Sequence, residues 1–235
     1  MLKINNKSVY KVYKNQSIVK KMYKAGNKVF EYKNPNLPQG YTECKYIQTG
    51  QGENYINTGF VPNDYGGNYT FVLDFQGVAL PSASRYMCGT GSPRSCNIRV
   101  NTNGSINVYN ETMETSGAAI VVSLSTEEAD ILNRNKYKII VRDEQSTILK
   151  KGGVEYSQEN ASRSDSTVSF KIGHTAGTNG YDFKIYNSKI YDGSDALIRN
   201  FTPCLDTNNV PCFYDSVTQQ TYYNAGTGVF QYELL

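Results

Sequence analysis

The sequence predicts an all-β protein, an antiparallel two-sheet sandwich of the jelly-roll type preceded by a small β-strand anchor. Its composition supports this, because 20 tyrosines, 20 glycines and no tryptophan among 235 residues suit short strands joined by tight turns. Short alternating or apolar runs recur between turn signals, and a single short segment has a helical pattern. Hydrophobic residues make up 39% of the chain, which is enough for a packed core.

Charge and proline content divide the chain into three parts. Residues 1–34 carry nine lysines and one acid, Glu31, a formal charge of +8, whereas the whole chain carries +3. Residues 34–40 contain two prolines and a glycine, which disfavour regular structure. We therefore expect a lysine-rich β-repeat anchor at residues 1–34, a linker at residues 35–40 and one sandwich domain at residues 41–235.

The anchor repeats every ten residues. Turn-forming pairs fall between the repeats at residues 15–16 and 26–27, which predicts three short strands in a meander. Roughly 33 residues are too few to fold alone, so we expect the anchor to dock on another protein or on copies of itself. The aligned positions are Val9, Val19 and Val29, together with Lys11 and Lys14, which recur as Lys21 and Lys24.

Two other interpretations of the anchor stay open. Lysines interleaved with tyrosines are typical of segments that bind nucleic acid through phosphates and stacking, although the anchor contains no arginine. A solvated basic tail would also explain the charge, although tails seldom keep valine, isoleucine, methionine and tyrosine in register. The β periodicity favours docking, and we expect no nucleic-acid partner.

Strand-like segments follow one another through the main domain. Asn103-Gly104 and Gly152-Gly153 each separate two of them and predict tight hairpins. So many short strands with one short helix, at residues 125–133, predict the two-sheet sandwich. The expected strands cover residues 69–75, 97–100, 105–109, 119–124, 137–141, 147–150, 154–156, 167–172, 182–186, 189–191, 213–215 and 228–232.

The cysteines carry no metal or disulfide pattern. None is part of a C-x-x-C pair, and His174 is the only histidine, so a zinc site has little support. The chain begins without the apolar run of a secretory signal, and no window is apolar enough to span a membrane. We expect thiols that mostly fill small core positions. They are Cys44, Cys88, Cys96, Cys204 and Cys212.

Both ends of the main domain resemble a known family. Residues 37–64 (LPQGYTECKYIQTGQGENYINTGFVPND) form the first segment, and residues 170–177, 183–204 and 213–230 (FYDSVTQQTYYNAGTGVF) form the closing stretch. These segments resemble concanavalin A-like, or laminin G-like, jelly-roll domains of bacteriophage and gut-bacterial surface proteins. The lysine-rich arm is similar to short repeats on virion proteins of tailed phages, including the crAss-like gut phages.

This resemblance implies a virion structural protein. We expect a capsid-attached head fibre or decoration protein that is made in the host cytoplasm and released by lysis. The arm would bind capsid or other virion proteins, and family analogy favours a homo-oligomer, with a trimer as the first guess. The jelly-roll head would bind host surface glycans. A bacterial carbohydrate-binding module without a virion is the alternative, followed by a glycoside hydrolase.

The resemblance also bears on catalysis. Related sandwiches include glycoside hydrolases, whose paired carboxylates stand on one strand in an E-x-D-x-x-E pattern. Here Glu128 and Asp130 form the nearest string, but the third acid is missing and the string lies on the expected helix. Ser125 with Glu128 instead fits a capping box. We therefore expect no enzyme and no catalytic residue.

One loop offers a candidate ligand rim. His174, Asn179, Tyr181 and Asp182 lie between two expected strands at one end of the sandwich. They combine aromatic faces with polar groups, as sugar sites commonly do. A polar loop with no ligand is the alternative for these residues.

We expect no cofactor, with calcium as the open alternative. Many laminin G-like domains hold calcium through loop oxygens. The conceivable ligands here are Asn63, Asp64, Asn179 and Asp182.

Overall fold

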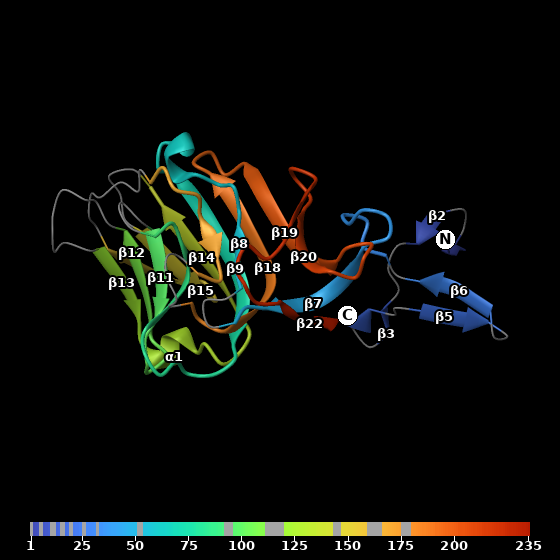
Figure 1. Cartoon of the computed structure of the whole chain (residues 1–235), viewed down its shortest axis with the longest axis horizontal. Helices are drawn as coiled ribbons and strands as arrows, with labels where there is room; N and C mark the ends of the chain where they lie inside the picture. Colours follow the sequence, from blue (N-terminus) through green and yellow to red (C-terminus); the bar gives the residue numbers. More distant parts are fainter. Residues whose placement is uncertain are drawn as a thin grey trace.

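The protein folds as two antiparallel sheets packed face to face, as the computed structural model shows (Figure 1). The predicted two-sheet jelly-roll sandwich is therefore confirmed. The structure describes residues 2–4, 7–9, 13–14, 17–18, 21–24, 27–31, 33–50, 54–91, 96–110, 120–142, 147–158, 166–174 and 180–235. No helix within these residues is long and apolar enough to cross a membrane.

The smaller sheet has six strands, all paired antiparallel. In spatial order they are β13 (Ile120–Leu124), β12 (Ile106–Asn110), β11 (Cys96–Val100), β10 (Arg85–Gly89), β17 (Lys171–Ile172) and β8 (Ile56–Asn57).

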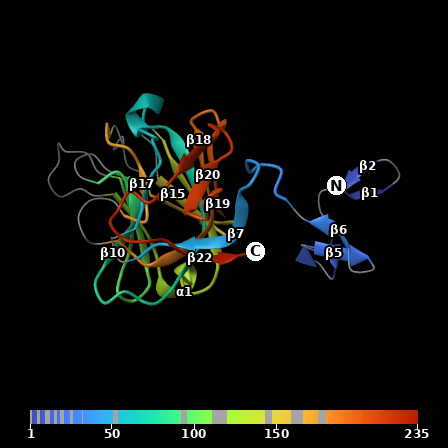
Figure 2. The same cartoon turned by 45° about the vertical axis from the view of Figure 1, so that its right-hand side comes forward.

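The larger sheet has ten strands. Its C-terminal strand β22 (Gln231–Leu234) pairs with β7 (Thr42–Gln48), and Figure 2 shows the two side by side. In spatial order the other strands are β16 (Val154–Gln158), β15 (Thr147–Lys151), β14 (Asn135–Val141), β9 (Tyr69–Gly77), β18 (Phe183–Asp192), β7, β19 (Leu197–Leu205), β20 (Pro211–Asp215) and β21 (Gln220–Tyr222).

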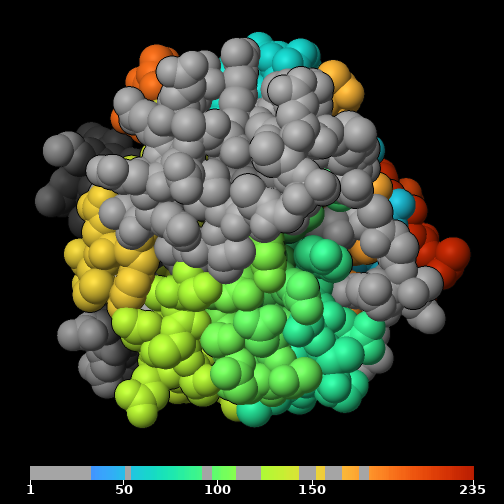
Figure 3. Space-filling model, turned by 90° about the vertical axis from the view of Figure 1, so that its left-hand side faces the viewer, coloured from blue at the N-terminus to red at the C-terminus, as the bar shows by residue number. Residues whose placement is uncertain are grey.

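The core lies between the two sheets. Along β9, Phe71, Leu73 and Phe75 are buried on the inner face, because side chains two residues apart share one face of a strand. They join one continuous cluster with Ile98 and Val108 of the smaller sheet. At one edge β13 lies beside β15 and β16, and Figure 3 shows the molecule from the side on which residues of the smaller sheet, in green, are visible.

Both predicted hairpins are confirmed. Asn103 and Gly104 separate β11 from β12, and Gly104 has a φ of +86°. Gly152 and Gly153 separate β15 from β16, with φ values of +57° and +90°. Both turns favour glycine, because in any other residue the Cβ atom makes such positive φ angles costly.

Several predicted elements differ in extent, the strand expected at residues 228–232 lies at 231–234, and strands β7, β8, β10, β19 and β21 were not predicted. The strands expected at residues 182–186 and 189–191 are one strand, β18, with a register shift between Ile185 and Asn187. The strand expected at residues 167–172 is only β17, and the helix is shorter than predicted. Helix α1 (Thr126–Ala129) ends at Asp130, which has a φ of +43°, because a left-handed residue cannot continue a helix. A 3-10 helix, η1 (Pro62–Tyr65), precedes β9.

The anchor forms three separate hairpins, so the predicted three-strand meander is wrong. Ile4 pairs with Lys7, Lys14 with Ser17 and Lys24 with Asn27, each at the same place in the ten-residue repeat. Each ten-residue repeat therefore contains a whole hairpin, and its strands are only two to five residues long. The strands are β1 (Leu2–Ile4), β2 (Lys7–Val9), β3 (Tyr13–Lys14), β4 (Ser17–Ile18), β5 (Lys21–Lys24) and β6 (Asn27–Glu31).

Four cysteines are free and buried, which confirms their prediction as core thiols. The Cys204 and Cys212 sulfurs form no disulfide and lie 3.6 Å apart, within hydrogen-bond distance. Burial raises the pKa of the Cys44 thiol to about 12, so this thiol stays protonated at neutral pH. The side chain of Cys96 lies outside the described residues. Leu37 of the predicted linker packs against Cys204 and Cys212, so the linker already belongs to the sandwich at that point.

Candidate functional site

Most of the predicted ligand rim faces inward. Tyr181 is 2% exposed, and its hydroxyl donates to the Ala79 carbonyl at 2.7 Å while its ring stacks on Phe183. His174 is also buried and meets the ring of Tyr55 edge-on at 5.0 Å. Neither ring is free to stack on a sugar, because neighbouring side chains already cover it.

Of the remaining two rim residues, Asp182 and Asn179, the structure describes only Asp182. Asp182 is half-buried, and burial raises the pKa of its carboxyl group above the ordinary value. It lines a small cleft of about 220 Å³ with Ser82 and Arg85. Asn179 lies outside the described residues. The structure thus brings the segments of His174 and Tyr181 to strand β10, and Tyr181 and Asp182 line the same small cleft, whose lining residues do not include His174.

The burial of His174 predicts a pH effect on stability. Burial and the nearby Lys171 ammonium lower the pKa of His174 below its ordinary value. Near pH 6 the unfolded chain therefore binds more protons at this position, so stability falls as the pH drops from about 6.5 towards the lower native pKa. We expect His174→Gln to lose less stability than wild type between pH 7.5 and 5.5 in urea unfolding. Equal losses would show that His174 contributes nothing to this dependence.

The three described calcium candidates, Asn63, Asp64 and Asp182, do not converge, and Asn179 lies outside the described residues. Asn63 and Asp64 lie on η1, before the start of β9. Asp182 lies at the other end of β9, where the Val78 amide donates to its carbonyl. Nine residues of strand separate the two ends by roughly 27 Å, so these residues cannot hold one cation together. In the described part of the chain, no group of three or more His, Cys, Asp or Glu side chains has metal-binding geometry.

Glu128 is engaged in capping helix α1. Its carboxylate accepts the Ser125 amide at 2.8 Å, and the Ser125 hydroxyl accepts the Glu128 amide at 3.3 Å. The hydrogen bond from the Ser125 amide lowers the pKa of the Glu128 carboxyl group. Asp130 follows the helix and accepts from the Asn133 side chain at 2.9 Å. The predicted capping box is confirmed.

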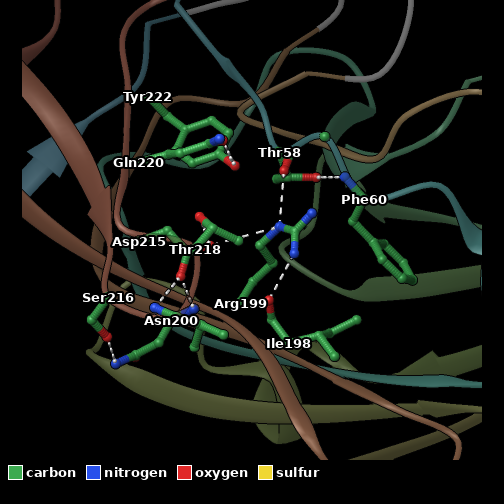
Figure 4. A network of polar contacts seen from close by, with 12 residues as sticks. Thr58, Phe60, Ile198, Arg199, Asn200, Asp215, Ser216, Thr218, Gln220 and Tyr222 are labelled. Carbon is green, nitrogen blue, oxygen red and sulfur yellow. Dashed lines mark hydrogen bonds and ion pairs between the residues drawn. The ribbon is translucent and has the colours of Figure 1, made fainter.

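A buried ion pair stabilises the C-terminal hairpin. Asp215 is fully buried and accepts the amides of Asn200 at 2.8 Å and Val217 at 3.0 Å and the Thr218 hydroxyl at 2.7 Å. Its carboxylate also lies 3.7 Å from Arg199 (Figure 4). Protein groups occupy this carboxylate, so the cluster is structural.

The outer face of the larger sheet carries a groove that the sequence interpretation missed. We call it the lysine groove; its volume is about 510 Å³. Buried Val72 lies among its lining residues, and three lysines from two strands surround an apolar and aromatic surface. The lining residues are Val72, Lys136, Lys138, Gly152, Gly153, Lys189, Tyr191 and Asp195.

Strand periodicity places these side chains on one face. Lys136 and Lys138 are exposed and flank the buried Tyr137 on β14. Lys189 and Tyr191 are half-buried and flank the buried Ile190 on β18. The turn between β15 and β16 and the turn after β18 complete the groove. The alternating K-Y-K pattern at residues 136–138 indicated exposed lysines, but the sequence does not tell which strand lies beside them.

Comparisons with known proteins find similarity at the level of structure only. No family model matches the chain, and no curated protein is significantly similar in sequence. Domains LG4–5 of the mouse laminin α1 chain match with a TM-score of 0.49 and 8% identity over 66% of this chain, which spans 43% of the laminin chain. The phage origin that the resemblance implies stays a prediction.

Two further solved structures are similar at comparable levels. The CBM40 of the Ruminococcus gnavus IT-sialidase, bound to α2,3 sialyllactose, matches with a TM-score of 0.47 and 15% identity over 66% of this chain and 91% of that chain. A heptameric SAP-like pentraxin from Limulus polyphemus matches with a TM-score of 0.40 and 9% identity, over 64% and 70%. The fold assignment itself rests on the sheet topology.

The predicted docking residues of the anchor are located only by their backbone. Lys14, Lys21 and Lys24 lie on strands β3 and β5, and Val9 and Val29 lie on β2 and β6. Lys11 and Val19 lie outside the described residues. Docking through these residues stays a prediction.

Proposed function

We propose that this chain is a non-enzymatic glycan-binding protein of a virion surface, with its jelly-roll head as the binding part and its anchor as the attachment part. The observation that carries the proposal is the lysine groove. Its volume of about 510 Å³ falls within the range of ligand sites, and it combines apolar surface with a few polar groups, as such sites do.

The groove offers the contacts that a sugar ring needs. Tyr191 supplies an aromatic face beside the apolar side chain of Val72, and aromatic rings pack well against apolar surfaces. Each lysine ammonium supplies three hydrogen-bond donors. A carbohydrate-binding module without a virion would use the same groove. The positive charge of the anchor favours a virion protein over such a module.

A glycan-binding assay tests the role of the head. We expect the full-length protein to bind members of an array of host surface glycans, and Tyr191→Ala to weaken that binding at least tenfold because the stacking face is lost. Tyr232→Ala is the matched control, because Tyr232 is exposed on β22 and contributes nothing to the groove. Absence of binding to any glycan, or equal binding by all three proteins, would reject the proposal.

Charge reversal tests the role of the anchor. Replacing Lys11, Lys14, Lys21 and Lys24 with glutamate should block incorporation into particles, because attraction to an acidic shell surface becomes repulsion. The same four positions changed to arginine keep the charge and should leave occupancy unchanged. Normal occupancy of the glutamate variant would show that these lysines do not mediate attachment.

A further inference from the structure

The described lining of the lysine groove has an excess of positive charge, with three lysines and one acid, Asp195. Among the described residues, no carboxylate forms an ion pair with Lys136, Lys138 or Lys189. Lys136 and Lys138 are exposed, whereas Lys189 is half-buried. Three lysines lining one groove repel one another, so an anion there would relieve the repulsion.

Two acids nearby are already engaged by arginines. Asp74, directly opposite Lys136 across the β9–β14 ladder, accepts two hydrogen bonds from Arg134, both at 2.9 Å. Asp195 lines the groove, and its carboxylate lies 3.7 Å from Arg142. Each of these two carboxylates therefore lies beside an arginine guanidinium. The ammonium groups of the three lysines remain available to another partner.

The strand register aligns the lysines in a row across the sheet. Val72 pairs with Lys138 on one side and with Lys189 on the other, so the three side chains lie on the same face of the sheet. The backbones at Lys138 and Lys189 are two strands apart, roughly 9–10 Å, so cations flank the apolar floor.

We propose that the lysine groove binds an acidic saccharide, with carboxylate or sulfate groups paired to Lys138 and Lys189 and a sugar ring against Val72 and Tyr191. This inference rests on the proposed function and specifies its class of ligand. The groove favours a saccharide over nucleic acid, because its described lining residues include no arginine and a single aromatic ring, whereas single-stranded nucleic acid calls for successive stacking rings along a basic path.

Matched probes test the charge requirement. An oligogalacturonate and its methyl ester share their sugars and differ in charge, and a sulfated galactan tests sulfate as the source of charge. We expect the full-length protein to bind at least one acidic probe at least tenfold more tightly than the neutral ester in calorimetry at low salt. This preference should shrink as salt screens the exposed lysines.

Charge-reversing variants test the location. Lys138→Glu and Lys189→Glu should each weaken binding of the preferred acidic probe at least tenfold. Lys184→Glu is the matched control, because Lys184 is on the same strand as Lys189 but its ammonium lies 4.6 Å from the Tyr46 ring, outside the groove. Circular dichroism checks that each variant keeps its β fold.

The outcomes separate the two proposals. Equal binding of acid and ester, both lost on Tyr191→Ala, would overturn the acidic ligand and leave the proposed function standing. Failure to bind any saccharide would overturn both. Binding of a single-stranded oligonucleotide more tightly than every saccharide would overturn this inference in favour of nucleic acid, and unchanged acid binding by both groove variants would overturn the location.

Discussion

Replacing Asp215 with alanine is expected to lower the free energy of unfolding by about 3–5 kcal/mol. The carboxylate is fully buried and accepts three hydrogen bonds that join β19, β20 and the following turn. Its removal leaves those donors unsatisfied and the Arg199 guanidinium, only 15% exposed, without its counter-charge. Urea unfolding followed by circular dichroism measures the loss.

Two further variants make this result specific. Asp64→Ala removes an exposed carboxylate and should change stability by less than about 0.5 kcal/mol. Asp215→Asn keeps one acceptor oxygen and should fall between wild type and Asp215→Ala. If Asp215→Ala is as stable as Asp64→Ala, the buried pair does not stabilise the hairpin.

Replacing Phe170 with alanine should destabilise the protein by a similar amount, about 3–5 kcal/mol. Its ring is 1% exposed and lies 4.9 Å from the ring of Phe71 and 6.4 Å from that of Phe60. Phe170 comes from the smaller sheet side and Phe71 from the larger sheet, so the substitution opens a cavity between the layers.

The control for Phe170 lies two residues before it. Val168 is 38% exposed, and Val168→Ala should cost less than about 1 kcal/mol because little buried surface is lost. Thermal unfolding should thus give a lower midpoint for Phe170→Ala only. Similar midpoints for both variants would mean that Phe170 does not join the two layers.

Local patterns in the sequence predicted the local structure well. The dipeptides Asn103-Gly104 and Gly152-Gly153 sit in the predicted hairpins, and Ser125 with Glu128 caps the helix. Each depends on residues close together in the chain. The single long strand β18 was missed because a register shift at residues 185–187 interrupts its alternation. In the anchor, the ten-residue period could not distinguish one strand from one hairpin.

The candidate site was harder to predict because it depends on pairing between distant strands. Lys138 and Lys189 are 51 positions apart, and only the register through Val72 places them on one groove. The burial of Tyr181 was also hard to predict. This residue follows a loop with polar residues, but its ring stacks on Phe183 and its hydroxyl donates to the carbonyl of Ala79, 102 positions earlier in the chain, and a contact with so distant a residue leaves no local pattern.

A crystal structure of the full-length protein with the preferred acidic oligosaccharide tests the central claim most directly. We expect density for the sugar in the lysine groove, with an acidic group within hydrogen-bond distance of Lys138 or Lys189 and a ring against Tyr191. Density in the cleft beside Arg85 and Asp182 instead, with the lysine groove holding only water, would contradict it.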